Sequence, residues 1–351
     1  MKSNMTKDDC VNILFGFTSN KYDKIDEMLH SLEAYISENE YDVQVELILH
    51  MFRTYKIAHT SNCFEDICEV AAPVFELLKT TDWGYIELYV LTTAIIYTPH
   101  HTISEDFKNE ALDILDDDFC DHKDYDRLKS TLHLNLSMRH LRAKYHDGAD
   151  PQDVKVLFDQ CFDVALSIYE KRGRVTLRTI LLLRKAIFDG DCNKILEYLD
   201  ALEATGERAL RQITQDDMIE FLHLLGDRIT KPLQNFLIGH QIKKRRKELG
   251  MGTLDFADAI GSTQTVVNGF ERGDKGIGGP RLHKISKVLN VDMAYFYGDE
   301  SKKYTGAVTD ITTHKISQLV SELPEADKEY ILELTRGYIK HKKKMLQPHI
   351  D

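Results

Sequence analysis

Residues 253–273 read TLDFADAIGSTQTVVNGFERG, and this stretch decides the fold of the C-terminal third of the chain. Its apolar side chains recur three and four residues apart, which predicts two short amphipathic helices. These side chains are Phe256, Ala257 and Ile260 in the first helix, and Val266, Val267 and Phe270 in the second. Gly261 lies between the helices and adopts a positive φ without strain, so it allows a steep turn. We therefore expect the second helix to cross closely over Ala257.

The outward face of the second helix carries Gln264, Thr265 and Asn268. These short amide and hydroxyl side chains differ from the Glu and Lys of an ordinary solvated helix face. Gln and Asn bind adenine edges in the major groove of DNA in a bidentate manner, and Thr contacts the thymine methyl group. The three residues are therefore candidates for base contacts.

The surrounding 60 residues resemble the Cro/C1-type (XRE) helix-turn-helix of phage repressors and bacterial regulators. Residues 242–250 resemble the first helix of that family, and Phe270-Glu-Arg-Gly273 resembles the end of its recognition helix. Residues 280–296 resemble the last two helices. Their expected core consists of Leu282, Ile285, Leu289, Val291 and Phe296. The resemblance implies a five-helix, lambda-repressor-like domain that binds double-stranded DNA.

The resemblance also implies roles for single residues. It implies a structural pair between Arg246 of the first helix and Glu271 of the recognition helix. Phosphate contacts are expected from residues near helix N-termini and in the following turn. These candidates are Thr253, Thr263, Arg272 and Lys275.

Three features depart from the family pattern. Arg245 stands where an apolar residue is usual, and Gly269 lies within the recognition helix. Gly costs a helix interior about 1 kcal/mol relative to Ala. The turn over residues 273–279 is long and rich in glycine.

The charge distribution separates the chain into parts. The 351 residues carry a net charge of −12, which alone argues against nucleic acid. Residues 236–303, however, carry 12 Lys/Arg against 8 Asp/Glu, whereas residues 1–235 carry 26 against 42. An acidic body repels DNA and a basic domain attracts it. We therefore predict an N-terminal helical domain over 1–233, a DNA-binding domain over 234–300 and a terminal helical segment over 301–351.

Residues 1–233 show a succession of amphipathic helical patterns and no convincing strand, so the whole chain is predicted to be all-α. The strongest pattern begins at Asp150-Pro151, a typical N-cap and first turn. Helices joined by short turns favour a tetratricopeptide-like set of helical hairpins, with an irregular helical bundle as the alternative. A helical body joined to a Cro/C1-type domain resembles the peptide-sensing RRNPP regulators, although their DNA-binding domain comes first. The resemblance implies a peptide or protein ligand on the helical body.

Residues 301–351 are expected to form a terminal helical hairpin. Two helices alone cannot bury their apolar stripes, so the hairpin is predicted to dimerise the chain. The stripe consists of Ile316, Val320, Tyr330, Ile331, Leu334 and Tyr338. A homodimer predicts an inverted-repeat operator, because two copies meet two half-sites.

The composition and motifs point away from several other classes of protein. The chain has no apolar run of about 18 residues and no signal-peptide core, which predicts a cytoplasmic protein without a membrane span. The six cysteines form no CxxC pair, and no motif for a catalytic, metal or cofactor site is present. The sequence therefore predicts a transcription regulator, most simply a repressor, and not an enzyme. Two alternatives stay open: a phage- or plasmid-type repressor whose body only oligomerises or binds an antirepressor, and a helical scaffold without DNA binding.

Overall fold

The structure is a computed structural model that describes residues 5–17, 23–61, 63–98, 101–205, 221–222 and 225–297. The described residues form helices and no β-strand, which confirms the all-α prediction. The chain divides into two compact units, Met1–Ile229 and Thr230–Asp351. No helix in the described part of the chain is both long and apolar enough to cross a membrane.

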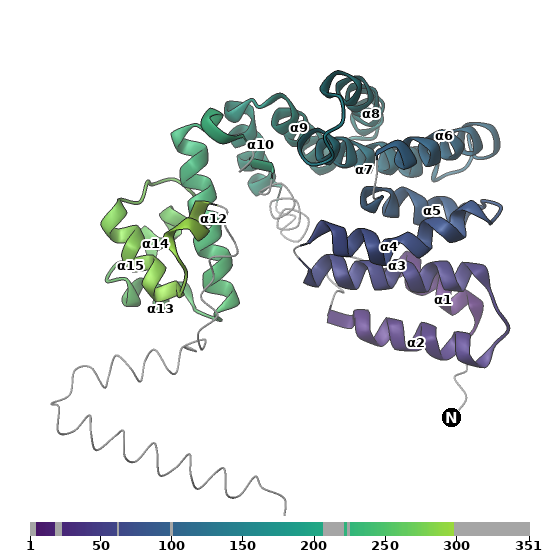
Figure 1. Cartoon of the computed structure of the whole chain (residues 1–351), viewed down its shortest axis with the longest axis horizontal. Coiled ribbons are helices and arrows are strands. Elements are labelled where there is room, and N and C mark those ends of the chain that lie inside the picture. Colours follow the sequence, from purple (N-terminus) through teal and green to yellow (C-terminus); the bar gives the residue numbers. More distant parts are fainter. Residues whose placement is uncertain are drawn as a thin grey trace, which may run out of the picture. The chain divides into compact units, whose positions relative to one another are not determined.

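The N-terminal unit consists of a series of helices (Figure 1). Those that the structure describes in full are α1 (Lys7–Gly16), α2 (Ile25–Glu38), α3 (Val43–Thr60), α4 (Phe64–Lys79), α5 (Tyr85–Ala94), the 3₁₀ helix η2 (Ile95–Tyr97), α6 (His101–Asp118), α7 (Tyr125–Tyr145), α8 (Pro151–Arg172), α9 (Val175–Asp189), α10 (Cys192–Ala204) and the 3₁₀ helix η3 (Gly226–Arg228). Helices that follow one another pack together, including α2 on α3, α3 on α4, and α7 to α10 in sequence.

Local sequence signals explain where these helices begin. The Asp150 carboxylate accepts hydrogen bonds from the amides of Gln152 (2.8 Å) and Asp153 (3.2 Å), and Pro151 opens α8. At α1, the Thr6 hydroxyl and the Asp9 carboxylate accept from each other's backbone amide, at 3.2 and 2.8 Å. Such caps satisfy amides that have no partner within the helix.

Helix α7 is the central helix of this unit, since it packs against α5, α6, α8 and α9. It buries charged residues as well as apolar ones. Arg139 is fully buried and pairs with Asp147, which lies just after the helix. The Arg142 guanidinium lies 4.0 Å from the ring centroid of Phe64, at the start of α4. The interior of the helical body therefore contains buried charges as well as apolar side chains.

The C-terminal unit begins with α12 (Lys231–Glu248), followed by α13 (Thr253–Ala259), α14 (Gln264–Glu271), α15 (Gly279–Leu289) and the 3₁₀ helix η4 (Met293–Tyr297). The two compact units meet at 229/230, just before α12 begins. The boundary expected from sequence, at 233/234, lies within the first turn of this helix, where Leu233 is buried. The core of this unit contains the expected residues Leu282, Ile285, Leu289, Val291 and Phe296, together with residues of α12, α13 and α14.

The predicted terminal segment, 301–351, lies outside the described residues. The same applies to the whole dimerisation stripe: Ile316, Val320, Tyr330, Ile331, Leu334 and Tyr338. The proposed dimer contact therefore stays a prediction from sequence.

Candidate nucleic-acid interface

The turn between α13 and α14 follows from three residues. Gly261 has φ +63°, in the left-handed region, and the amide of Ser262 donates to the carbonyl of Ala257 at 2.8 Å. Thr263 then caps α14, because its hydroxyl oxygen accepts from the amide of Val266 at 3.4 Å. Ala257 is fully buried. The turn redirects the chain so that α14 packs across α13.

A buried ion pair holds α14 against α12. Arg246 Nε donates to Glu271 Oε1 at 2.6 Å, and Arg246 Nη2 donates to Glu271 Oε2 at 3.0 Å. The third guanidinium nitrogen, Nη1, donates to the carbonyl of Met251 at 2.6 Å. The side chains of Arg246 and Glu271 are only 8% and 6% exposed. The structure thus brings together the two residues that the resemblance pairs, and it fixes the end of α14.

Helices α12 and α14 also approach each other closely at Gly239. A Cβ atom at this position would lie 2.0 Å from the carbonyl oxygen of Phe270. No side chain fits such a gap, so the crossing depends on glycine. Together with the Arg246–Glu271 pair, this contact fixes how α14 is rotated about its axis.

The three candidate base-contact residues lie on the outer side of α14. Gln264 and Thr265 are exposed and Asn268 is half-buried, whereas Val267 and Phe270 face the core. Within the described residues, no hydrogen bond engages the side chains of Gln264, Thr265 or Asn268. Their donors and acceptors are therefore available to an external partner.

The predicted phosphate contacts differ in their surroundings. Thr253 is the first residue of α13 and is half-buried. The hydroxyl of Thr263 uses its oxygen in the cap, which leaves its proton for a phosphate oxygen. Arg272 pairs with Asp274, at 2.8 Å from Nε and 2.7 Å from Nη2, and both side chains are exposed. Lys275 is exposed and its stem lies against Gly269. The Asp274 carboxylate offsets part of the charge of Arg272, a contact that we did not predict from sequence.

Arg245, which departs from the family pattern, has a structural role in this fold. Its Nε donates to the carbonyl of Leu289 at 3.1 Å, and its Nη1 pairs with Glu248 at 2.9 Å. The side chain is buried and caps the last turn of α15, where unpaired carbonyls carry partial negative charge. The arginine at this position therefore stabilises the packing of α12 against the end of α15 through a hydrogen bond, where the family usually has an apolar contact.

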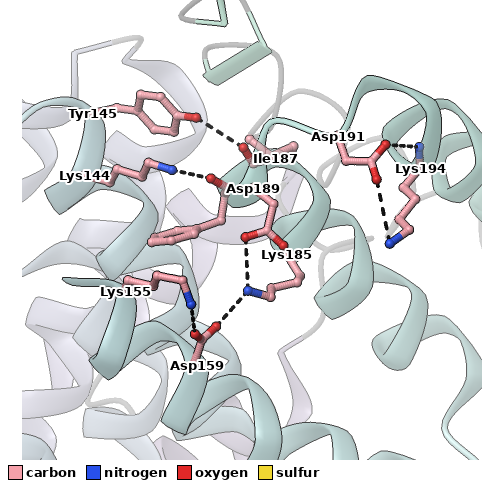
Figure 2. Close-up of polar contacts among 10 residues, drawn as sticks. Lys144, Tyr145, Lys155, Asp159, Lys185, Ile187, Asp189, Asp191 and Lys194 are labelled. Carbon is pink, nitrogen blue, oxygen red and sulfur yellow. Dashed lines mark hydrogen bonds and ion pairs between the residues drawn. The ribbon is translucent and has the colours of Figure 1, made fainter. Parts of the chain in front are cut away.

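Lys144, Lys155 and Lys185 form a lysine cluster near the C-terminal end of α9 (Figure 2), the kind of charge cluster that can bind an anion. Lys185 Nζ, however, pairs with Asp159 at 2.7 Å and with Asp189 at 3.1 Å. Lys144 donates to the carbonyl of Phe188 near the end of α9, and burial lowers the pKa of this lysine. These cations are used to hold α7, α8 and α9 together, so the cluster is a packing feature.

Comparison with known proteins agrees with this geometry. Residues 242–296 match the helix-turn-helix family model. An HTH-type transcriptional regulator of Escherichia coli, DicA, is 29% identical over 120 residues, which cover 32% of this chain and 89% of DicA. An uncharacterised HTH-type transcriptional regulator of Sinorhizobium medicae is 27% identical over 103 residues, covering 29% of this chain and 73% of the relative. No solved structure matches the chain significantly.

The C-terminal part of this chain thus contains a helix-turn-helix domain of the XRE type. Its relatives are named as transcriptional regulators, which supports a role in DNA-binding transcription regulation. The matches cover about a third of the chain or less, and they leave the role of most of the helical body open.

Proposed function

We propose that this chain is a sequence-specific DNA-binding regulator that represses transcription in the cytoplasm. The observation that carries the proposal is the way α14 is held. The buried Arg246–Glu271 pair fixes the helix, while Gln264, Thr265 and Asn268 lie on its outer side and form no side-chain hydrogen bond with any residue that the structure describes. Helices that read DNA present amide and hydroxyl groups of this kind to the major groove.

Each side chain of the interface has a proposed role. Gln264 and Asn268 lie four residues apart on one row of α14, so both reach the same stretch of groove. They bind adenine edges, and Thr265 contacts a thymine methyl group. Thr253, Thr263 and Arg272 bind phosphate and set the register of α14 on the duplex. Arg272 must break its ion pair with Asp274 to bind phosphate. The loss of stability is small, because exposed ion pairs contribute about 0–1 kcal/mol.

A single helix-turn-helix domain reads too few base pairs to select one site in a genome. Proteins of this kind therefore present two domains to half-sites spaced by about one helical turn of DNA. We propose a homodimer that binds an inverted-repeat operator, with residues 301–351 as the contact between copies. The chemistry of the apolar stripe in that segment supports this assignment.

The helical body is proposed to be a tetratricopeptide-like domain that binds a peptide or protein ligand. Its support is the sequential packing of α2 to α4 and of α7 to α10, which resembles stacked helical hairpins. The alternative is a body that only oligomerises the chain or binds an antirepressor. If the body binds a peptide, a small peptide should change the affinity of the dimeric chain for its operator. If the body only oligomerises the chain or binds an antirepressor, peptides should leave this affinity unchanged.

Selection of duplexes from a random-sequence pool by the full-length chain tests the proposal. We expect an enriched inverted repeat whose half-sites contain A·T pairs opposite Gln264 and Asn268. Specific protein–DNA complexes are typically about 10³–10⁷ times tighter than nonspecific ones, so enrichment should appear within a few rounds. A pool that stays random after selection would support the scaffold without DNA binding instead.

A further inference from the structure

One position on the DNA-facing side of α14 has no side chain. Gln264 and Asn268 form one row along the helix, and Thr265 and Gly269 form a second row, because residues four apart lie on the same face. Three of these four positions carry polar side chains. The fourth is glycine, which leaves a gap one turn beyond Thr265.

The stem of Lys275 lies over this gap. A Cβ atom built at Gly269 would lie 3.6 Å from Lys275 Cδ, 3.8 Å from Cγ and 3.9 Å from Cε. These are ordinary van der Waals distances, so the hydrocarbon stem lies over the place where a side chain at position 269 would begin. Gly269 is buried and Lys275 is exposed. The stem thus covers the helix where a side chain is missing, while Lys275 as a whole stays exposed to solvent.

Two glycines fix the loop that carries Lys275. Gly273 has φ +80°, and a Cβ there would lie 2.6 Å from Cα of Phe236, so only glycine fits against α12. At Gly276, a Cβ would lie 3.3 Å from the side-chain oxygen of Asn235. Because the loop meets α12 on both sides of Lys275, this side chain is directed back over α14.

The charges of the loop distinguish Lys275 from its neighbours. The Arg272 guanidinium is paired with Asp274. Within the described residues, the ammonium of Lys275 has no ion-pair partner. A lysine that binds phosphate needs to reach only the rim of the groove. The stem of Lys275 instead lies over Gly269, on the row of α14 that continues from Thr265, a predicted base contact.

We propose that Lys275 is a specificity-determining residue that replaces the side chain missing at Gly269. Its ammonium group donates to O6 and N7 of a guanine in the major groove, the acceptors that lysine and arginine recognise. This proposal rests on the proposed DNA-binding function and revises the phosphate role predicted for Lys275. It places one G·C pair in each half-site, next to the pair read by Thr265.

Duplex selection with the full-length chain tests this assignment. The variants are Lys275→Met, which keeps the stem and removes the charge, and Lys275→Arg, which keeps a guanine-binding cation. Lys287→Met, on the exposed side of the last turn of α15, is the matched control for loss of one positive charge. We expect Lys275→Met to lose the preference at one base pair per half-site, with discrimination of G·C from A·T there falling about 5- to 150-fold. Lys275→Arg and Lys287→Met should keep the wild-type motif.

A second variant distinguishes a change in base recognition from a loss of folding, because it is expected to change the preferred base and not only to weaken binding. Gly269→Gln places an amide at the gap and displaces the Lys275 stem, so the preference at the same base pair should change from guanine to adenine. A motif that stays unchanged in Lys275→Met, with uniformly weaker binding and a salt dependence reduced by about one phosphate contact, would overturn the inference. If the wild type enriches no motif, the proposed function itself fails, which is a distinct result.

Discussion

Removal of the Glu271 carboxylate tests how α14 is held in place. In the native structure, Arg246 donates two hydrogen bonds to Glu271, at 2.6 and 3.0 Å, with both side chains less than a tenth exposed. In Glu271→Ala, the only hydrogen bond that the buried guanidinium keeps within the described residues is the one to the carbonyl of Met251. Loss of one partner of a buried pair costs about 3–5 kcal/mol, because the remaining charge stays desolvated.

A second arginine–carboxylate pair provides the control. Arg272 and Asp274 lie next to Glu271 in sequence and form an equally short pair, but their side chains are 60% and 50% exposed. Asp274→Ala removes the same charge as Glu271→Ala. Exposed pairs contribute about 0–1 kcal/mol, so we expect little change in stability from this variant.

Hydrogen exchange of the α12 and α14 amides in the full-length chain measures the difference. A cost of 3–5 kcal/mol corresponds to a fall in amide protection of about two to four decades in Glu271→Ala. The same amides should change by less than about one decade in Asp274→Ala. Equal protection in the two variants would refute the reasoning, since burial of the Arg246–Glu271 pair would then have no energetic consequence.

Further predictions concern recognition, packing, pH dependence and assembly. Gln264→Ala should lower specific DNA affinity by about 1–3 kcal/mol and leave nonspecific affinity unchanged in competition assays, whereas equal losses on both duplexes would argue against base contact. Gly239→Ala should destabilise the C-terminal unit by about 1–3 kcal/mol or more, because the added methyl group overpacks the contact between α12 and α14. Gly278→Ala is the control, since a Cβ there meets nothing within 4 Å, and urea unfolding should show no loss of stability in this variant. Burial lowers the pKa of His133 to about 4, so below pH 6.5 the unfolded chain binds a proton that the folded chain does not, and the free energy of unfolding falls as the pH drops toward 4. His133→Leu should therefore lose about 2 kcal/mol less stability than the wild type between pH 7 and 5. Leu334→Asp should give a monomer by light scattering, and a dimer that persists would move the contact to another part of the chain.

The parts of the fold that were predictable from sequence are those set by local chemistry. The apolar spacing of residues 253–270 and the positive φ of Gly261 define α13 and α14 without reference to the rest of the chain. The cap at Asp150 and Pro151 likewise marks the start of α8. The outward face of α14 was also predictable, because the buried positions of a short amphipathic helix leave only one side exposed.

The parts that were not predictable depend on contacts between distant segments. Arg245 appeared out of place because its partner is the carbonyl of Leu289, which is known only once α15 is positioned. The position of Lys275 depends on how the glycine-rich loop meets α12. The unusual glycines at 269, 273 and 276 were the available signal, because each marks a close approach or a missing side chain. In the helical body, the burial of Arg139 and Arg142 depends on their contacts with Asp147 and Phe64, which the spacing of apolar residues in α7 does not indicate.

The ratio of specific to nonspecific DNA affinity tests the central claim most directly. The full-length chain would be titrated with its selected duplex and with a scrambled duplex of equal length and composition, at a fixed salt concentration. The account predicts a ratio of about 10³ or more, with protection of two half-sites in a footprint. A ratio near one, with the same salt dependence for both duplexes, would contradict it, because the basic charge of the C-terminal unit would then explain all the binding.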